Sequence, residues 1–228
     1  MKTSRVLQPI VQESTPSLIA AQLRGHIAEG ALAPGAQLVE ADIARELGVS
    51  RGPIREAIQR LTQEGLLVSI RNRGVFVSEF DESDIRDIYE ARTAVEKAAA
   101  GILADGDRAR AGAELLRRVE RMDEARAAGD ETAISEADIA FHEKLVEMAA
   151  SPRLSKMHAT LLTETRMCLN RLQGRYDDES VRVVEHRGIA EAIRDGKRDL
   201  VMDRLDAHKD DALARLLPAQ ETNGTAVS

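Results

Sequence analysis

Four residues in the C-terminal half of the chain have the side chains and the spacing of a metal site. Asp138 and His142 are four residues apart, so a helix would place them one turn apart on one face. His186 and His208 fall in two further helical segments. A bundle that turned these faces inward would gather one carboxylate and three imidazoles, a set suited to Zn²⁺, Ni²⁺, Mn²⁺ or Fe²⁺ with a position left open. The spacing alone is more typical of a surface pair or of a histidine satisfied in the core.

A second set of residues, near the N-terminus, is suited to binding nucleic acid. Ser50 is placed to cap the start of a helix in which Arg51, Arg55 and Gln59 follow one another at one-turn intervals. Arginine and glutamine side chains can reach base edges and phosphates in a major groove. An ordinary amphipathic helix with a charged outer face would show the same pattern, so the neighbouring segments decide between the two interpretations.

Those segments predict a winged helix-turn-helix. A helix over 40–47 ends at Gly48 and precedes the basic helix, which gives a helix-turn-helix. Two β-like stretches, 66–70 and 75–77, then flank a tight turn and predict a hairpin, or wing. The wing residues suited to a minor groove or to phosphates are Arg71, Arg73 and Gly74.

The remaining pattern is mainly helical. A helix over 17–29 and a short strand over 37–39 complete the N-terminal part. Apolar residues at helical spacing, separated by short breaks, predict an antiparallel bundle of about six helices in the second part of the chain. The six predicted helices span residues 81–104, 108–128, 131–150, 154–172, 180–195 and 199–217.

Composition and charge narrow the class of protein. The chain has 228 residues, 43% apolar and only 2% aromatic, which favours helices packed through aliphatic side chains. Residues 1–80 hold nine Lys or Arg against eight Asp or Glu, whereas residues 81–228 hold 23 against 31. DNA contact is therefore expected only through a focused patch in the N-terminal part. A single cysteine, Cys168, and the absence of a signal peptide or a long apolar run predict a cytoplasmic protein without a membrane span.

Several spaced motifs mark the N-terminal part of the chain. They are Gly30-x3-Pro34-Gly35-x2-Leu38-x-Glu40, Leu47-Gly48-Val49-Ser50-Arg51-x-Pro53-Ile54-Arg55-Glu56-Ala57-Ile58, Glu64-Gly65-Leu66 and Arg73-Gly74. In order and spacing they resemble the GntR family of bacterial transcription regulators over residues 17–77. The resemblance implies a homodimer that binds double-stranded DNA at a palindromic operator. Gly52 departs from the family, which usually carries Thr there, so a hydroxyl contact to DNA would be missing.

The helical part carries a second set of spaced motifs. They are Tyr89-Glu90-x-Arg92-x3-Glu96, Asp138-x2-Phe141-His142, Glu185-His186-x2-Ile189-x2-Ala192-Ile193-x2-Gly196, and His208. These motifs resemble the FCD domain of the FadR-type subgroup over about residues 81–217. In metal-binding members of that subgroup, one Asp and three His hold a divalent metal, and this chain has all four as Asp138, His142, His186 and His208. Two departures, Pro152 for Asn and Lys197 for Asp, are not at ligand positions.

An open metal position beside a cationic side chain is suited to a small carboxylate effector. Arg92 lies mid-helix among apolar neighbours, and the resemblance places it toward the cavity. Arg166 and Asn170, one turn apart, can line the opposite wall, although a surface position suits Arg166 equally well. The other two histidines, His26 and His158, show no pattern that indicates a function.

The expected organisation is a flexible segment (1–16), a winged helix-turn-helix domain (17–78), an FCD-type effector, metal-binding and dimerisation domain (79–217) and a flexible tail (218–228). The expected function is a sequence-specific transcription regulator, a repressor, controlled by a small organic acid. One alternative is a regulator that senses the metal itself. A metal-dependent hydrolase or lyase is disfavoured, because Glu143 and Glu185, beside the histidines, would point away from the metal.

Overall fold

The computed structural model describes residues 14–169 and 179–217. The chain divides into two compact units, Met1–Ser78 and Glu79–Ser228. The flexible segments predicted at the two ends lie outside the described residues, apart from residues 14–16, and so does Asn170. Each unit is described by itself.

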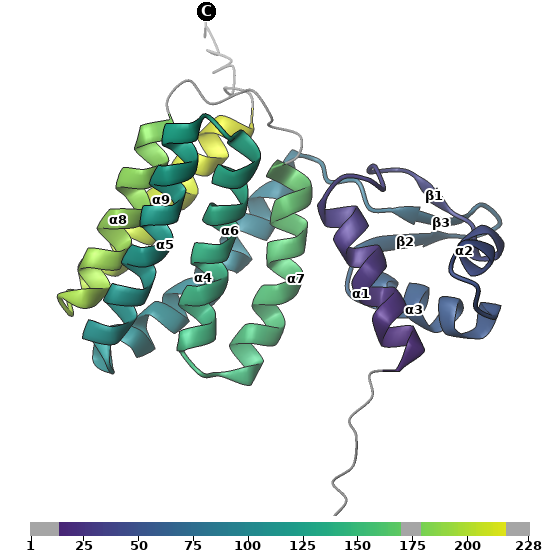
Figure 1. The fold of residues 1–228 in the computed structure, drawn as a ribbon, viewed down its shortest axis with the longest axis horizontal. Helices are drawn as coiled ribbons and strands as arrows, with labels where there is room; N and C mark the ends of the chain where they lie inside the picture. The colour runs from purple at the N-terminus through teal and green to yellow at the C-terminus, as the bar shows by residue number, and fades with distance from the viewer. Residues whose placement is uncertain (1–13, 170–178, 218–228) are drawn as a thin grey trace, which may run out of the picture. The chain divides into compact units, whose positions relative to one another are not determined.

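The N-terminal unit is a winged helix-turn-helix, as predicted (Figure 1). Three antiparallel strands form a sheet in the order β1-β3-β2, and Ile70 of β2 is paired with Gly74 of β3 at the wing. The helices bury one apolar stripe each, and in the helix that follows Ser50 this stripe is Ile54, Ala57, Ile58 and Leu61. The elements are α1 (Thr15–Ala28), β1 (Gln37–Leu38), α2 (Glu40–Glu46), α3 (Arg51–Gln63), β2 (Leu67–Ile70) and β3 (Gly74–Val77).

The second unit is a helical bundle, which confirms the predicted fold class (Figure 1). In the described residues it has six helices, and α5 packs against α6 and α8 while α4 packs against α6, α7 and α9. Connections of two or three residues join most consecutive helices, which reverses the direction of the chain at each step. The helices are α4 (Glu82–Asp105), α5 (Arg108–Ala128), α6 (Glu131–Met148), α7 (Pro152–Leu169), α8 (Glu179–Arg194) and α9 (Arg198–Leu216).

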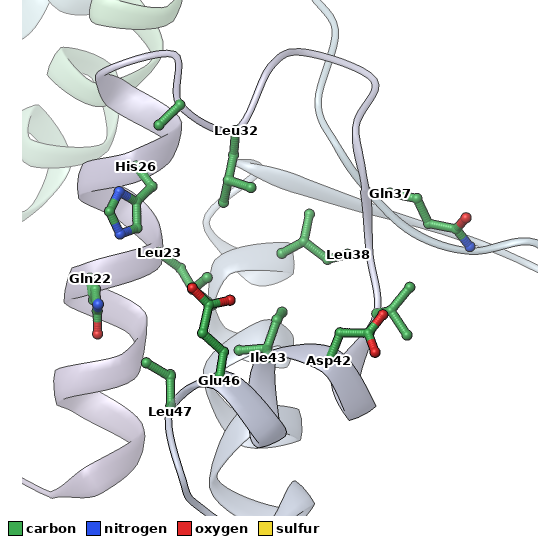
Figure 2. A pocket seen from close by; sticks show the side chains of 12 residues that line it. Gln22, Leu23, His26, Leu32, Gln37, Leu38, Asp42, Ile43, Glu46 and Leu47 are labelled. Carbon is green, nitrogen blue, oxygen red and sulfur yellow. The ribbon is translucent and has the colours of Figure 1, made fainter.

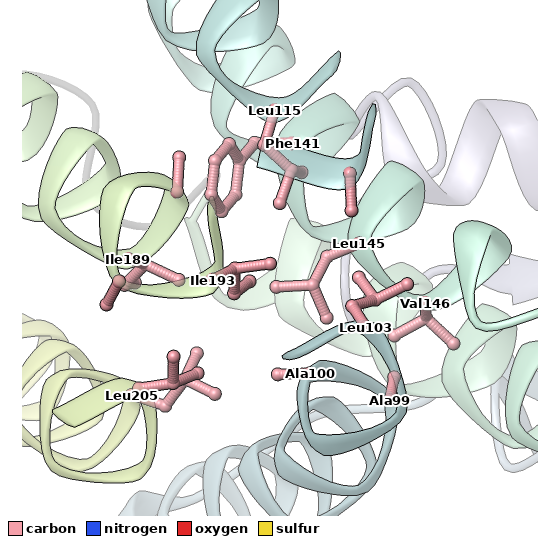
Figure 3. Close-up of a cluster of buried hydrophobic side chains, with 14 of the residues drawn as sticks. Ala99, Ala100, Leu103, Leu115, Phe141, Leu145, Val146, Ile189, Ile193 and Leu205 are labelled. Carbon is pink, nitrogen blue, oxygen red and sulfur yellow. The ribbon is translucent and has the colours of Figure 1, made fainter. Parts of the chain in front are cut away.

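Two apolar clusters form the interior of the bundle. The larger one gathers side chains from most of its helices, and Figure 3 shows Leu115, Leu145 and Ile193 meeting there. The smaller one includes Tyr89 near the start of α4 and Leu216 at the end of α9. Along both of these helices, the polar residues of the candidate site lie between the two clusters, so apolar packing holds the site from both sides.

Two helix starts differ from the prediction for the same reason. Pro16 and Pro152 were placed before their helices, but α1 begins at Thr15 and α7 begins at Pro152. The N–H groups in the first turn of a helix have no intrahelical acceptor. Proline, which lacks this N–H, therefore fits there without the loss of a hydrogen bond. The predicted cap at Ser50 is also only partly correct, because Ser50 occupies the N-cap position of α3 without a side-chain hydrogen bond.

Within the described part of the chain, every helix is too short or too polar to cross a membrane.

The contact between α4 and α7 predicts a pH-dependent stability. Burial of the Glu164 side chain, with the Asp87 carboxylate nearby, raises the pKa of Glu164 to about 7. The folded protein then binds more protons than the unfolded chain above about pH 4.5, so stability is lost as the pH rises through the folded pKa. We expect Glu164→Gln to raise the melting temperature at about pH 8 and to change it little at about pH 5.

Thermal unfolding followed by circular dichroism across this pH range checks that expectation. Glu143→Gln, at an exposed position on α6, is the matched control. An equal change in melting temperature at both pH values would contradict the assigned pKa of Glu164.

Candidate nucleic-acid interface and metal centre

The basic helix presents its predicted DNA-reading residues to solvent. Arg51, Gly52, Arg55 and Gln59 of α3 are all exposed, opposite the buried stripe that fixes the helix in its unit. Gly48, with a φ of 65°, provides the left-handed turn between α2 and α3 that brings the two helices together. The arrangement is that of a helix-turn-helix whose second helix is free to enter a major groove.

Arg55 is held by an acidic residue from the preceding helix. Its Nη2 lies 3.0 Å from Glu40 Oε2, and its Nε donates to Glu40 Oε1 over 3.3 Å. The partner comes from α2 and not from α3 itself. Because exposed ion pairs contribute little free energy, a phosphate or a base can replace Glu40 as the partner of Arg55.

The wing is a tight turn with an exposed basic tip. Arg71, Arg73 and Gly74 are exposed, and Gly74 has a φ of 112°, which favours glycine at this position. Gln37 Nε2 of β1 donates a hydrogen bond of 2.9 Å to the carbonyl of Arg73. The Arg73 guanidinium lies 5.7 Å from the centre of the Phe76 ring. These contacts fix the tip of the wing on the sheet.

The four predicted metal-ligating residues converge in the bundle. Asp138 and His142 come from α6, His186 from α8 and His208 from α9, and all four are buried. One ligand atom from each lies within 4.8 Å of the others. His142 Nε2 is 3.2 Å from His208 Nε2 and 3.1 Å from His186 Nε2, and His186 Nε2 is 3.2 Å from Asp138 Oδ1.

The outer nitrogens of the three rings face acceptors. His186 Nδ1 is 2.7 Å from the carbonyl oxygen of Arg182, and His208 Nδ1 is 2.8 Å from Glu185 Oε2. His142 Nδ1 is 3.1 Å from Glu96 Oε2, within ion-pair range but without the alignment of a full hydrogen bond. The acceptors beside His186 and His208 favour a proton on Nδ1 of these two rings, so the Nε2 atoms of both present lone pairs to the centre.

Electrostatics keep the carboxylates of the site charged. Burial alone would raise the pKa of Asp138, but His186, His142 and Arg182 outweigh it and hold the pKa well below its usual range. For Glu96, Arg92 and His142 likewise outweigh burial and lower the pKa. The group therefore offers anionic oxygen atoms at neutral pH.

The central imidazole is kept neutral. Burial lowers the pKa of His142 to about 3, although the Glu96 carboxylate opposes this shift. Burial also lowers the pKa of His208, with Glu185 opposing it. Neutral imidazoles are the form that binds metals, and the lone pairs of these two rings are available.

The arrangement fits a divalent metal ion. Ligand atoms about 2.1 Å from one ion lie roughly 3 to 3.4 Å from their neighbours in tetrahedral or octahedral geometry, which is the spacing of His142 Nε2 from the Nε2 atoms of His186 and His208. Three imidazoles and one carboxylate suit Zn²⁺, Ni²⁺, Mn²⁺ or Fe²⁺. Without a cation, lone pairs facing one another in a buried site would repel.

A small cavity adjoins these residues. Its volume is about 10 Å³, which is room for about one water molecule. Two ligand residues contribute to its wall, together with three arginines. The lining residues are Tyr89, Arg92, Asp138, Leu169, Arg182, His208, Ala212 and Arg215.

Models of known families match both units. The model of the bacterial regulatory proteins of the gntR family covers residues 16–77, and the FCD domain model covers residues 87–211. The chain belongs to the GntR family. Its FCD domain places it in the subgroup that the sequence motifs indicated.

Relatives and solved structures agree with this membership. A protein named as a probable D-xylose utilization operon transcriptional repressor, from Paenarthrobacter nicotinovorans, is 31% identical over 90% of both chains. A GntR transcriptional regulator structure from Rhodococcus sp. RHA1 has a TM-score of 0.77 and 30% identity, covering 91% of this chain and 99% of its own. The E. coli McbR/YncC structure, with a TM-score of 0.76 and 22% identity, covers 90% and 98% and shares the fold. The chain is thus a DNA-binding transcriptional regulator, with repressors among its relatives.

The three residues predicted to bind an effector do not all line the small cavity beside the histidines. Arg92 lines the cavity, and its guanidinium lies 5.2 Å from the centre of the Tyr89 ring. Arg166 is outside the lining, with its Nη2 3.0 Å from Glu136 Oε2. Asn170 lies outside the described residues.

Other residues around the site did not stand out in the sequence. The sequence gives no functional pattern for His158, but this residue is buried with its Nε2 3.0 Å from Glu96 Oε1. Arg182 and Arg215 also line the cavity, and helical spacing could have indicated them. Arg182 precedes His186 by one turn and Arg215 follows His208 by two turns, so each shares a face with a ligand.

The winged-helix unit holds a larger hollow with different chemistry (Figure 2). It has a volume of about 290 Å³ and lies between α1, α2 and β1. Its floor is apolar, with Leu23, Leu38 and Ile43, and the carboxylates of Asp42 and Glu46 are beside it. Its lining includes none of the residues predicted to bind DNA or metal.

Proposed function

We propose that the protein controls transcription by binding an operator with affinity set by a small organic acid, which binds beside a divalent metal in the bundle. One observation carries this proposal. Three imidazoles and a carboxylate converge beside a cavity that is also lined by three arginines. A metal with an open position and nearby guanidinium groups suits a carboxylate, because metal and arginine can each take an oxygen.

DNA contact is assigned to the exposed face of α3 and to the wing. In this proposal Ser50, Arg51, Gly52, Arg55 and Gln59 lie along the major groove. Their exposure and one-turn spacing support that role. At the wing, Arg71, Arg73 and Gly74 contact the minor groove or phosphates. A homodimer would place two such surfaces on the half-sites of a palindromic operator.

The metal is assigned to Asp138, His142, His186 and His208. Their burial, spacing and tautomers support this assignment. When bound, the ion would compensate the facing lone pairs and supply a Lewis-acid position for an oxygen of the effector. Arg92 would orient the same effector by its charge, from the wall of the cavity.

The names of relatives guide the choice of acids to try. The gluconate operon transcriptional repressor of Bacillus subtilis is 28% identical over 87% of this chain and 83% of its own. Gluconate is a small hydroxy acid, so it belongs to the chemical class that the metal and the arginines would recognise. We place gluconate and other small hydroxy acids first among the candidates.

A second candidate function is metal sensing. The cavity has room for about one water molecule, so the described conformation is closed to an organic acid. A regulator that responded to the metal alone would need no larger space. The two functions differ in whether an acid adds to the effect of the metal on operator binding.

The assignment of Arg55 predicts a loss of operator affinity. We expect Arg55→Ala to cost roughly 1–3 kcal/mol of binding free energy if the side chain reads a base. Fluorescence anisotropy on a site selected from random duplexes by the wild type measures this. Arg45→Ala, on the exposed side of α2 and paired there with Asp42, is the matched control.

A double variant separates two causes of that loss. Arg55→Ala leaves the Glu40 carboxylate unpaired near DNA, whereas Glu40→Gln with Arg55→Ala does not. Affinity restored to the wild-type value in the double variant would show that Arg55 only neutralises Glu40. A loss of operator affinity that persists in the double variant supports a contact between Arg55 and DNA.

The metal assignment predicts a fixed stoichiometry. We expect elemental analysis to find about one divalent ion per chain in the wild type and a loss of that ion in His142→Ala and His208→Ala, because each removes a ligand. His26→Ala, at an exposed histidine in the other unit, should keep the ion. A wild-type protein that stays metal-free after incubation with Zn²⁺, Ni²⁺, Mn²⁺ and Fe²⁺ would refute the assignment.

The effector assignment predicts that acid and metal act together. We expect gluconate or another hydroxy acid to change operator affinity by about fivefold or more in the metal-loaded protein and not in the metal-free protein. Operator titrations with Zn²⁺ alone, acid alone and both measure this. If Zn²⁺ alone gives the full change and no acid adds to it, the protein is a metal sensor.

A further inference from the structure

Two chains of contacts connect the wall of the cavity to the metal-ligating histidines. In the first, Arg215 Nη2 is 2.7 Å from Glu185 Oε1, and Glu185 Oε2 is 2.8 Å from His208 Nδ1. In the second, Arg92 Nε is 2.7 Å from Glu96 Oε1, and Glu96 Oε2 is 3.1 Å from His142 Nδ1. Each glutamate thus offers one oxygen to an arginine of the cavity and the other to a ligand.

We propose that Arg92 and Arg215 are positioning residues that tune metal affinity through Glu96 and Glu185. An anion in the cavity and the metal would then be coupled through these chains. The inference rests on the proposed function, because it requires a metal at the histidines. It adds a mechanism by which the effector and the metal sense each other.

The sign of the coupling follows from hydrogen-bond strength. A carboxylate that accepts the Nδ1–H of a ligand histidine increases the electron density at Nε2 and strengthens the bond to the metal. An arginine on the same carboxylate draws charge away and weakens that effect. When an anion takes the arginine as its own partner, the glutamate binds the histidine more strongly, and the metal is held more tightly.

The size of the cavity supports this exchange of partners. It has room for about one water molecule, and both Arg92 and Arg215 belong to its lining. An organic acid can enter only if lining side chains move, and the Arg215 side chain is 25% exposed, so it can turn toward solvent. Admission of an acid would therefore loosen the ion pair between Arg215 and Glu185. Because linkage is reciprocal, bound metal favours the same state.

A simpler explanation would give the same sign. A guanidinium near a cation repels it through space, so removing Arg215 would tighten metal binding without any role for Glu185. The two explanations differ when Glu185 is changed as well. Through-space repulsion persists with glutamine at position 185, whereas an effect carried by the carboxylate disappears.

A double-mutant cycle with Zn²⁺ as the probe tests the inference. Zn²⁺ affinity is measured by competition with a chromophoric chelator for the wild type, Arg215→Gln, Glu185→Gln and the double variant. We expect Glu185→Gln to weaken Zn²⁺ binding by about tenfold or more. We expect Arg215→Gln to tighten it by about fivefold in the wild-type background and to have no effect in the Glu185→Gln background.

A spectroscopic readout and a matched variant exclude a general effect on folding. The d–d absorption of bound Co²⁺ reports the ligand field, and it should shift in Arg215→Gln but not between Glu185→Gln and the double variant. Arg166→Gln removes an arginine from an ion pair of similar length that lies outside the cavity. This variant should change neither the Zn²⁺ affinity nor the d–d absorption of bound Co²⁺.

Equal effects of Arg215→Gln in both backgrounds, or weaker Zn²⁺ binding in Arg215→Gln, would overturn the inference. Wild-type protein that binds none of Zn²⁺, Ni²⁺, Mn²⁺ and Fe²⁺ would instead refute the metal assignment itself. If another of these ions binds in place of Zn²⁺, the same cycle is measured with that ion. The stoichiometry of the wild type, measured first, separates these two failures.

Discussion

The helical unit is built around three imidazole rings that meet in its interior. His142 Nε2 is 3.2 Å from His208 Nε2 and 3.1 Å from His186 Nε2, and the Nδ1 atoms of His186 and His208 each lie within hydrogen-bond distance of an acceptor. The rings come from α6, α8 and α9, so they meet only when the bundle is assembled. In the proposed metal-bound form, a cation at the centre would replace these nitrogen–nitrogen contacts with a bond from each ring to the metal. The packing of the bundle is compatible with that form.

The free-energy cost of burying Glu96 and Arg92 beside the histidines supports the same proposal. Glu96 and Arg92 are buried, and Glu96 also contacts His142 and His158. Removing such a pair from water costs several kcal/mol, and apolar side chains of similar volume often stabilise a core as well or better. A buried network of this kind is therefore poorly explained by stability alone. The Glu96 carboxylate would instead orient His142 in the proposed metal site.

The sequence predicted the elements and the convergence of the four candidate ligands better than it predicted their partners. Helical periodicity located each helix to within a few residues, and proline in a first turn explains the two starts that were misplaced. The ligand set was within reach because Asp138 and His142 lie on one helix face and the family motif supplied the rest. His158 and Glu96 are 62 residues apart, and Arg55 and Glu40 lie on different helices, so only the tertiary fold reveals these contacts. Contacts between side chains of different helices produce no periodic pattern in a sequence.

The same contacts constrain how a signal could reach DNA. The exposed Arg55–Glu40 pair contributes little free energy, and the wing is fixed by Gln37, so the reading surface is already formed without DNA. The step that an effector controls is therefore unlike a folding of the α3 face and the wing, because both are already folded. In the proposed mechanism the effector must bind two states of the protein unequally, or it can shift nothing. A change in the spacing of two preformed winged helices within a dimer satisfies that condition, because the operator fixes the distance between its half-sites.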